Sequence, residues 1–191
     1  MDLNQLILDA SSRIKPFIRK TNFCHSETFS KLLDGEVYFK LENHQFTGSF
    51  KVRGALNKIL TINDAEKSIR RVISASTGNH GAAVAYAARQ ANIECNIYVP
   101  KGSSKAKLSK MKSYGANITL FGNDCVEAEA KARGLSDKKL IPYVSPYNDF
   151  HVVAGQGTIG TEIKSQIEKL DVIIISLGGG GLMAGTASYL K

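Results

Sequence analysis

Alternation between strand-type and helix-type segments is the feature that most constrains this chain. Short aliphatic stretches such as 71–75 and 95–99 are each followed by a segment with helical periodicity. This pattern is typical of βαβ units, in which parallel strands form a sheet that helices cover on both faces. The sequence therefore predicts the α/β fold class.

The expected elements follow one another without an internal repeat, a low-complexity tract or a linker rich in Pro, Gly and Ser. We expect strands at residues 37–41, 71–75, 95–99, 117–121, 143–144 and, as a buried strand, 172–177. We expect helices at residues 49–60, 79–90, up to about 113, 124–133, 158–170 and 182–191. Ligands of such sheets bind where the strands end and the helices begin. Three motifs occupy such junctions: residues 47–51, 76–80 and 178–181.

The first motif places Lys51 among glycine, serine and aromatic residues. A lysine that forms an imine must be neutral part of the time, which requires partial burial and a positive neighbour. Phe50 and Arg53 are the candidates for these two effects. The alternative is a solvated lysine in the first turn of a helix.

Four consecutive glycines, Gly178 to Gly181, lie between an aliphatic segment and the last expected helix. Consecutive glycines let the backbone turn its N–H groups inward, and the start of a helix adds positive potential, so the loop can hold a phosphate. The glycines also fit the loose dinucleotide fingerprint, but the acidic residue that it needs about 20 positions later does not occur before the chain ends. The structural alternative is close packing of a strand against a helix.

The third motif, residues 76–81, reads Ser-Thr-Gly-Asn-His-Gly. Its hydroxyl groups, its flexible glycine and the amide groups at the start of a helix together suit a carboxylate. Asn79 is alternatively a helix cap, and His80 is alternatively an ordinary packed or solvated histidine.

Charge and composition limit the other function classes. The 191 residues are 43% apolar, which is enough for one full core or two small ones. The 25 Lys and Arg against 17 Asp and Glu give a formal charge of +8. However, the lysines between 101 and 112 fit a solvated helix face without interleaved aromatic residues, so we expect no nucleic-acid partner. A positive field also suits anionic small molecules.

The first residues and the cysteines indicate the compartment. The N-terminal residues have no basic and apolar signal pattern, and the longest aliphatic run, 172–175, is too short to span a bilayer. We therefore expect a cytoplasmic protein with no membrane partner. Cys24, Cys95 and Cys125 are widely spaced, so we expect reduced thiols and no metal site.

An imine-forming lysine, a phosphate site and a carboxylate site together meet the needs of a pyridoxal phosphate enzyme that acts on an amino acid. The motifs also resemble a family. Residues 40–55, KLENHQFTGSFKVRGA, closely resemble the lysine region of the fold-type II pyridoxal phosphate enzymes, specifically the serine/threonine dehydratase and serine racemase group. Residues 76–81, residues 155–163 and the four glycines match the same group in the same order, so the resemblance covers essentially the whole chain.

The resemblance implies a pyridoxal 5'-phosphate cofactor that Lys51 binds covalently, with Phe50 beside the ring and Asn79 on the phenolic oxygen of the ring. It implies that the phosphate is held by Gly178, Gly179, Gly180, Gly181 and Leu182. It implies that the substrate carboxylate is received by Ser76, Thr77, Gly78, Asn79 and His80. Lys51 would remove the α proton. Thr77 is the second catalytic candidate, because serine racemases of this group carry a serine acid there, whereas many dehydratases carry alanine.

The same resemblance implies two three-layer domains with parallel sheets, of the tryptophan synthase β-like type. The larger domain, residues 1–46 and 146–191, is expected to be incomplete in this chain, and the smaller domain is expected at residues 47–145. We expect either a fragment of a longer enzyme or a short chain with an incomplete large domain.

The implied activity is dehydration of L-threonine or L-serine, small amino-acid substrates, to a 2-oxo acid and ammonia by a homodimer. Serine racemisation is the near alternative. A non-catalytic ligand-binding remnant is the alternative from another class.

Overall fold

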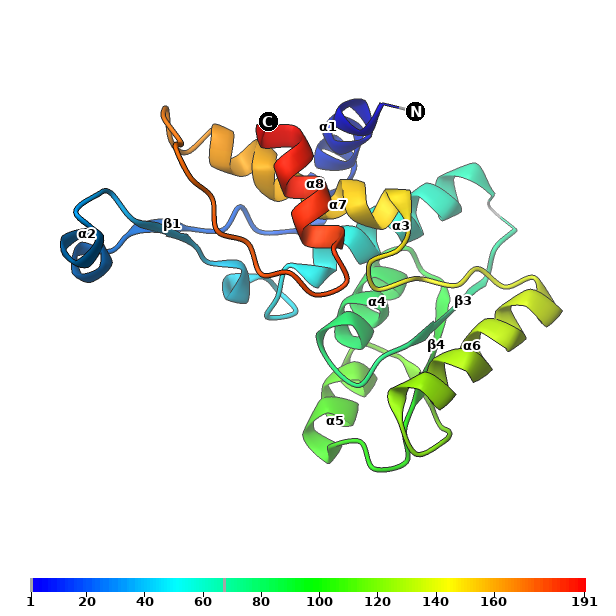
Figure 1. Cartoon of the computed structure of the whole chain (residues 1–191). Helices are drawn as coiled ribbons and strands as arrows, with labels where there is room; N and C mark the ends of the chain where they lie inside the picture. The colour runs from blue at the N-terminus through cyan, green and yellow to red at the C-terminus, as the bar shows by residue number, and fades with distance from the viewer. Residues whose placement is uncertain (1, 67) are drawn as a thin grey trace.

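A three-stranded parallel sheet lies at one end of the computed structural model, which describes residues 2–66 and 68–191 (Figure 1). Its strand order is β3-β4-β5, with β3 at Arg71–Ala75, β4 at Glu94–Val99 and β5 at Asn117–Leu120. Both pairings are parallel, and an isolated parallel bridge joins Ile73 to Tyr143 on the other side of β3. The expected α/β class with a parallel sheet is confirmed.

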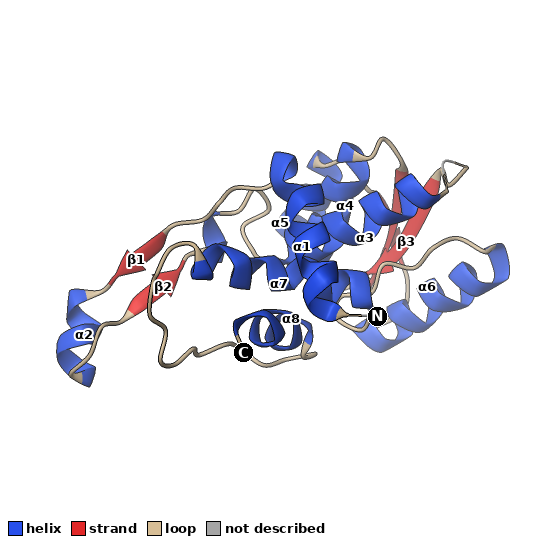
Figure 2. Ribbon diagram, turned by 90° about the horizontal axis from the view of Figure 1, so that it is seen from above, coloured by secondary structure: helices blue, strands red, loops and turns tan. Residues whose placement is uncertain are grey.

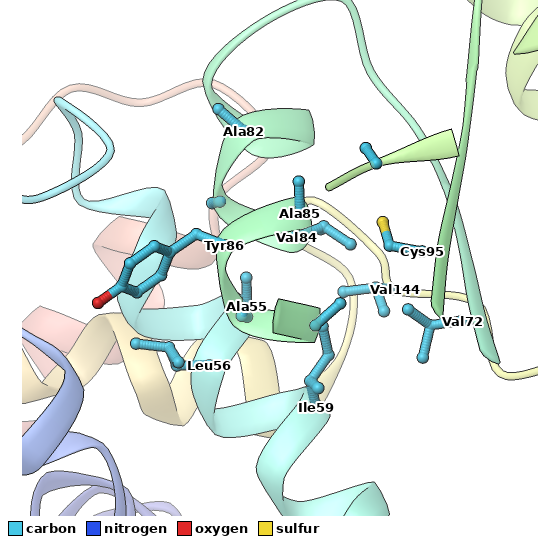
Figure 3. Close-up of a cluster of buried hydrophobic side chains, with 14 of the residues drawn as sticks. Ala55, Leu56, Ile59, Val72, Ala82, Val84, Ala85, Tyr86, Cys95 and Val144 are labelled. Atoms are coloured by element: carbon cyan, nitrogen blue, oxygen red, sulfur yellow. The ribbon is translucent and has the colours of Figure 1, made fainter. Parts of the chain in front are cut away.

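Three helices cover this sheet. Figure 1 shows α4 (Asn79–Gln90) and α5 (Lys105–Ser113) on one side of the strands and α6 (Cys125–Lys139) on the other. The core between α4 and its neighbours is rich in alanine, and Figure 3 shows Ile59, Val72, Val84 and Cys95 meeting there. Because alanine side chains are short, α4 packs closely against both the sheet and α3 (Lys51–Ala65).

The other end of the molecule is a group of helices centred on α7 (Phe150–Lys164). This helix contacts α1 (Leu3–Ile14), α3 and α8 (Gly181–Leu190). A Cβ atom on Gly155 would lie 2.6 Å from the Cα atom of Gly54 in α3, and one on Gly185 would lie 2.2 Å from the carbonyl oxygen of Val153. Glycine is therefore required at these positions because the helix backbones touch.

A small antiparallel unit projects from this body (Figures 1 and 2). Strand β1 (Phe23–His25) pairs with β2 (Tyr38–Lys40), and α2 (Glu27–Leu33) connects them. Two short 3-10 helices, η1 (Lys15–Phe17) and η2 (Glu42–His44), flank the unit. Helices α1 and α2 and strand β1 were not predicted. In α1 the signal was present, because Ile7, Ala10 and Ile14 have helical spacing and are buried.

Two predictions for the last third of the chain are wrong. The helix expected at 158–170 is α7, which begins at Phe150 because the Asp149 side chain accepts hydrogen bonds from the amides of His151 and Val152. The buried strand expected at 172–177 does not form: Val172 and Ile174 are 76% and 93% exposed. A strand needs a neighbour, and none of the described strands lies beside this segment.

The part of the chain assigned to the larger domain therefore contributes helices and the antiparallel pair, while the one parallel sheet among the described residues lies within 47–145. Within residues 2–66 and 68–191, no helix combines the length and the apolar character needed to cross a membrane.

Candidate functional site

Lys51 is the first residue of α3, and its amine contacts the backbone of another segment of the chain. Its Nζ atom donates a hydrogen bond to the carbonyl oxygen of Pro146 at 2.7 Å. The side chain is half-buried, and this burial lowers the pKa of the Lys51 amine below the ordinary value of a lysine. The solvated-lysine alternative therefore does not hold.

The two expected neighbours of Lys51 behave differently. Phe50 lies beside the amine, with 5.2 Å between Nζ and the ring centroid. Arg53 instead pairs with Glu42 and Glu162, and burial alone shifts the pKa of Lys51. The prediction that Arg53 supplies a positive neighbour is wrong, because side chains two positions apart on a helix point in nearly opposite directions.

The four glycines form the bend that leads into α8. Gly180 has a φ angle of +84°, in the left-handed region that glycine adopts without strain. No side chain caps α8, so its first amide groups are left without a capping acceptor. An open helix start of this kind favours an anion.

Tyr147 connects Lys51 to this glycine bend. It directly follows Pro146, the hydrogen-bond partner of Lys51. A Cβ atom on Gly179 would lie 2.3 Å from Cγ of the Tyr147 ring, and one on Gly181 would lie 3.0 Å from the Tyr147 carbonyl oxygen. Segment 146–147 therefore contacts both the lysine and the bend, and it brings the two motifs together.

The same distances bear on the packing alternative for the glycines. Gly179 and Gly181 do meet a packing requirement, but their neighbour is Tyr147 rather than a strand. Gly178 and Gly180 have open space where a side chain would stand. Packing therefore accounts for two of the four glycines.

The loop at 76–80 joins the carboxyl end of β3 to α4. The Ser76 hydroxyl oxygen accepts a hydrogen bond from the amide of Gly78 at 3.2 Å. Gly78 occupies the cap position of α4, and no side chain caps this helix. Asn79 is the first helical residue, so its interpretation as a helix cap is wrong. The start of α4, like that of α8, is open to an anion.

The His80 ring is buried and turned away from solvent. Its Nε2 atom lies 3.0 Å from the carbonyl oxygen of Val144, so Nε2 carries the proton and donates it. Burial and the positive charge of Lys51 lower the pKa of His80 to about 4, although the bond to Val144 opposes the shift. His80 is therefore neutral, and its backbone amide is the group able to meet a carboxylate.

Ser76 and Thr77 line a small hollow at the same edge of the sheet. Its other lining residues include Tyr98 of β4 and Cys125 and Glu129 of α6. The structure thus brings the hydroxyl motif to the ends of neighbouring parallel strands, as expected for α/β sheets.

Sequence reasoning missed Pro146 and Tyr147. Both follow the short strand expected at 143–144, whose partner is β3. The rule that ligand sites gather at the carboxyl ends of parallel strands applies to this segment too, and it was the signal available.

These features fit a small anion that carries a reactive carbonyl group. Lys51 supplies a partly neutral amine, and the starts of α4 and α8 supply free amides. In the loop just before Lys51, the buried hydroxyls of Thr47 and Ser49 have no hydrogen-bond partner. Pyridoxal phosphate has both an aldehyde and a phosphate, so the residues present fit this cofactor. Residues 2–66 and 68–191 contain no group of three His, Cys, Asp or Glu side chains placed to hold a metal ion.

Comparison with known proteins agrees with this fit. The family model described as "Pyridoxal-phosphate dependent enzyme" matches residues 14–191. The L-threonine ammonia-lyase of Thermotoga maritima is 40% identical over 185 residues, which cover 97% of this chain and 46% of that protein. The catabolic L-threonine dehydratase TdcB of Staphylococcus aureus is 44% identical over 186 residues, covering 97% of this chain and 54% of the relative.

A solved structure has the same fold over almost the whole of this chain. Maize serine racemase superimposes with a TM-score of 0.92 at 31% identity, covering 97% of this chain and 56% of the racemase. The chain thus spans about half the length of the curated relatives that it matches. A family model that extends over residues 14–191, together with these relatives, shows that the chain belongs to the pyridoxal-phosphate dependent enzymes of fold-type II.

Proposed function

We propose that this chain carries the lysine, phosphate and carboxylate sites of a lyase that dehydrates L-threonine or L-serine to a 2-oxo acid and ammonia. The observation that carries the proposal is the position of the half-buried Lys51 amine. This amine donates a hydrogen bond to Pro146, and the next residue, Tyr147, contacts the glycine bend. The names of the threonine ammonia-lyase and dehydratase relatives support the substrate class.

Each motif would hold a different part of the cofactor. Lys51 would bind the aldehyde carbon, Phe50 would pack beside the ring and Asn79 would bind the phenolic oxygen. The backbone amides of residues 178–182, at the open start of α8, would hold the phosphate. When bound, pyridoxal phosphate stabilises negative charge on the α carbon of an amino acid.

The chain itself supplies orientation and proton transfer. The open start of α4, with the hydroxyls of Ser76 and Thr77, holds the substrate carboxylate. Because burial lowers the pKa of Lys51, a larger fraction of its Nζ is neutral and able to accept the α proton. The Cα–H bond would break toward Nζ, and the ammonium group formed there would return this proton to the β-hydroxyl as the Cβ–O bond breaks, so that water leaves and Nζ is neutral again. The hydrogen bond to Pro146 fixes the direction from which Nζ approaches.

Serine racemisation is the second candidate. Thr77 places a hydroxyl on the carboxylate loop, where a second acid could return the proton to the opposite face, and maize serine racemase is a close structural neighbour. Chiral chromatography after incubation with L-serine separates the two candidates. We expect pyruvate to accumulate faster than D-serine, and the reverse would favour the racemase.

Three finer statements belong to the same proposal. We propose that residues 47–145 form the smaller domain and that residues 1–46 with 146–191 form the larger. We also propose a cytoplasmic homodimer. Exposed Phe29, Leu32 and Leu33 on the projecting α2 support an assembly surface. Light scattering tests the dimer, and cell fractionation tests the location.

Trapping the cofactor tests the proposal directly. The protein is incubated with pyridoxal phosphate and reduced with borohydride, and peptide mass spectrometry then locates the added mass. We expect it on Lys51, and we expect the matched Lys58→Ala variant of the same helix to be labelled equally while Lys51→Ala is not. Folded protein that traps no cofactor at Lys51 would favour the non-catalytic remnant.

A further inference from the structure

A cluster of four charged side chains is buried behind the first turn of α3. Arg53 pairs with Glu42 and Glu162, and Lys40 pairs with Glu162. The Arg53 side chain is 0% exposed, and those of Lys40, Glu42 and Glu162 are only 8%, 14% and 12% exposed. Two positive and two negative charges balance, so the cluster as a whole is neutral.

Every N–H group of Arg53 has an acceptor. Nε and Nη2 each lie 2.8 Å from a carboxylate oxygen of Glu42. Nη1 and Nη2 lie 2.8 and 3.0 Å from the two oxygens of Glu162, and Nη1 also lies 3.2 Å from the Thr158 hydroxyl. These are two bidentate forks, a geometry that the planar guanidinium group allows and a lysine amine does not.

Stability alone does not account for this cluster. Removing charges from water costs several kcal/mol per ion, and well-packed apolar residues often replace a buried ion pair with no loss. A fork, in contrast, fixes both the distance and the angle between two groups. The cluster therefore sets how the start of α3 lies against η2 and α7, which carry the two glutamates.

Arg53 acts on the same helical turn as Lys51. Side chains two positions apart diverge by about 200° around a helix axis. Arg53 therefore binds the two glutamates on one side of the first turn of α3, while Lys51 contacts Pro146 on the opposite side of the same turn. The helix that carries Glu162 also touches α3 where Gly155 meets Gly54, and it begins shortly after the Pro146 segment. The cluster thus joins the helix that carries Lys51 to the helix that follows the Pro146 segment.

We propose that Arg53 is a positioning residue: through Glu42 and Glu162 it holds the first turn of α3 so that the Lys51 amine stays against Pro146 and the glycine bend. The inference rests on the proposed function for the role of Lys51. Its test is therefore made first on protein without cofactor.

The measurement is the reactivity of Lys51 as a function of pH. Competitive acetylation followed by peptide mass spectrometry gives the labelled fraction of Lys51 at each pH. Arg53→Lys keeps the charge but loses both forks. We expect the midpoint of Lys51 labelling to rise in this variant toward that of the urea-unfolded chain, because a released amine regains water. In cofactor-loaded protein we expect kcat to fall roughly tenfold to a hundredfold.

Two further variants keep the test decisive. Val72→Ala removes part of a fully buried side chain in β3 that is not a member of the charged cluster, and it should lower the thermal midpoint without moving Lys51 labelling. Glu42→Gln weakens one fork and leaves the fork to Glu162, so it should give a smaller shift in the same direction as Arg53→Lys. It carries the test alone if Arg53→Lys does not fold.

An unchanged Lys51 midpoint in the folded Arg53 or Glu42 variant would overturn the positioning role, and so would an equal shift in Val72→Ala. Failure of the proposed function has a different signature. In that case Lys51 labelling would still depend on Arg53, while wild-type protein would trap no cofactor.

Discussion

Two helices at the candidate site, α4 and α8, begin differently from α6 and α7. α6 and α7 are capped by aspartates: Asp124 accepts a hydrogen bond from the amide of Glu127 at 2.9 Å, and Asp149 caps α7 in the same way. α4 and α8 begin after Gly78 and Gly180, which offer no cap. A capped start stabilises the fold, whereas an open start leaves its positive end for an anion.

The comparison also shows what an open start does not mean. α5 begins after Ser104 without a side-chain cap, yet none of the three motifs lies there. α4 and α8 differ from α5 because both are linked to Lys51. The positive charge of Lys51 lowers the pKa of His80 in α4, and the glycine bend before α8 contacts Tyr147, the neighbour of Pro146. An anion site therefore needs both free amides and a neighbour with complementary chemistry.

Gly179→Ala should have the largest effect on anion binding at the open start of α8. The new Cβ atom would lie 2.3 Å from the Tyr147 ring, so the bend must move. Losing two charge-assisted amide–phosphate hydrogen bonds should cost about 4 kcal/mol, roughly a thousandfold in affinity for pyridoxal phosphate. Equilibrium dialysis with the cofactor measures this loss.

The double variant Gly179→Ala with Tyr147→Ala separates shape from chemistry, because it makes room for the new methyl group. It should recover part of the affinity. Gly134→Ala in α6 is the matched control, since nothing lies within 4 Å of the added carbon. This control should bind cofactor normally and be more stable by about 0.5–1 kcal/mol. Normal binding by Gly179→Ala alone would contradict the assigned phosphate site.

His80→Gln tests whether His80, in the first turn of α4, is neutral in the folded protein. If it is, the positive potential at the open start of α4 comes from the backbone amides and not from a charged histidine. His80 has a pKa of about 4 in the folded protein against 6.5 for an ordinary histidine. Between these values the unfolded chain binds a proton that the folded chain does not, so stability rises with pH and is lost on acidification. The difference is on the order of 3 kcal/mol.

Urea unfolding at several pH values measures this dependence. His80→Gln keeps a donor for Val144 but cannot titrate, so its stability should fall less between pH 6.5 and about 4 than that of the wild type. Identical slopes for the two proteins would show that the His80 ring is not buried as described.

Asp149→Ala tests a capped start. It removes two hydrogen bonds to the first turn of α7 and the ion pair of Asp149 with Lys58, whose atoms are 2.6 Å apart. We expect a loss of about 2 kcal/mol in the free energy of unfolding. Chemical denaturation gives the value, and a change below about 0.5 kcal/mol would argue against the cap.

Asp124→Ala should have the smallest effect, because one exposed cap bond is lost at the start of α6. We expect about 1 kcal/mol of destabilisation with unchanged affinity for pyridoxal phosphate. Thermal unfolding and equilibrium dialysis test the two halves of this statement. A large loss of cofactor affinity would contradict the claim that a capped helix start contributes to stability and not to cofactor binding.

Much of the local structure could be predicted. β3 and α4 occupy the residues expected from periodicity and from the turn between them, 71–75 and 79–90. The segment at 172–177 shows the limit: its aliphatic residues predicted a buried strand, but burial depends on a partner strand that the composition of the segment cannot supply. The start of α7 was misplaced because the cap at Asp149 was not recognised.

The sequence by itself determined which chemical groups stand at the junctions between strands and helices, because turn glycines, caps and periodicity act through near neighbours along the chain. Only the tertiary structure decided where the side chains of those groups point. The Arg53 side chain points away from Lys51 and pairs with two glutamates. The His80 ring contacts the Val144 carbonyl oxygen, and the Tyr147 ring packs against Gly179. Burial, pKa and contact arise from residues far apart in sequence, so they exist only once the chain has folded.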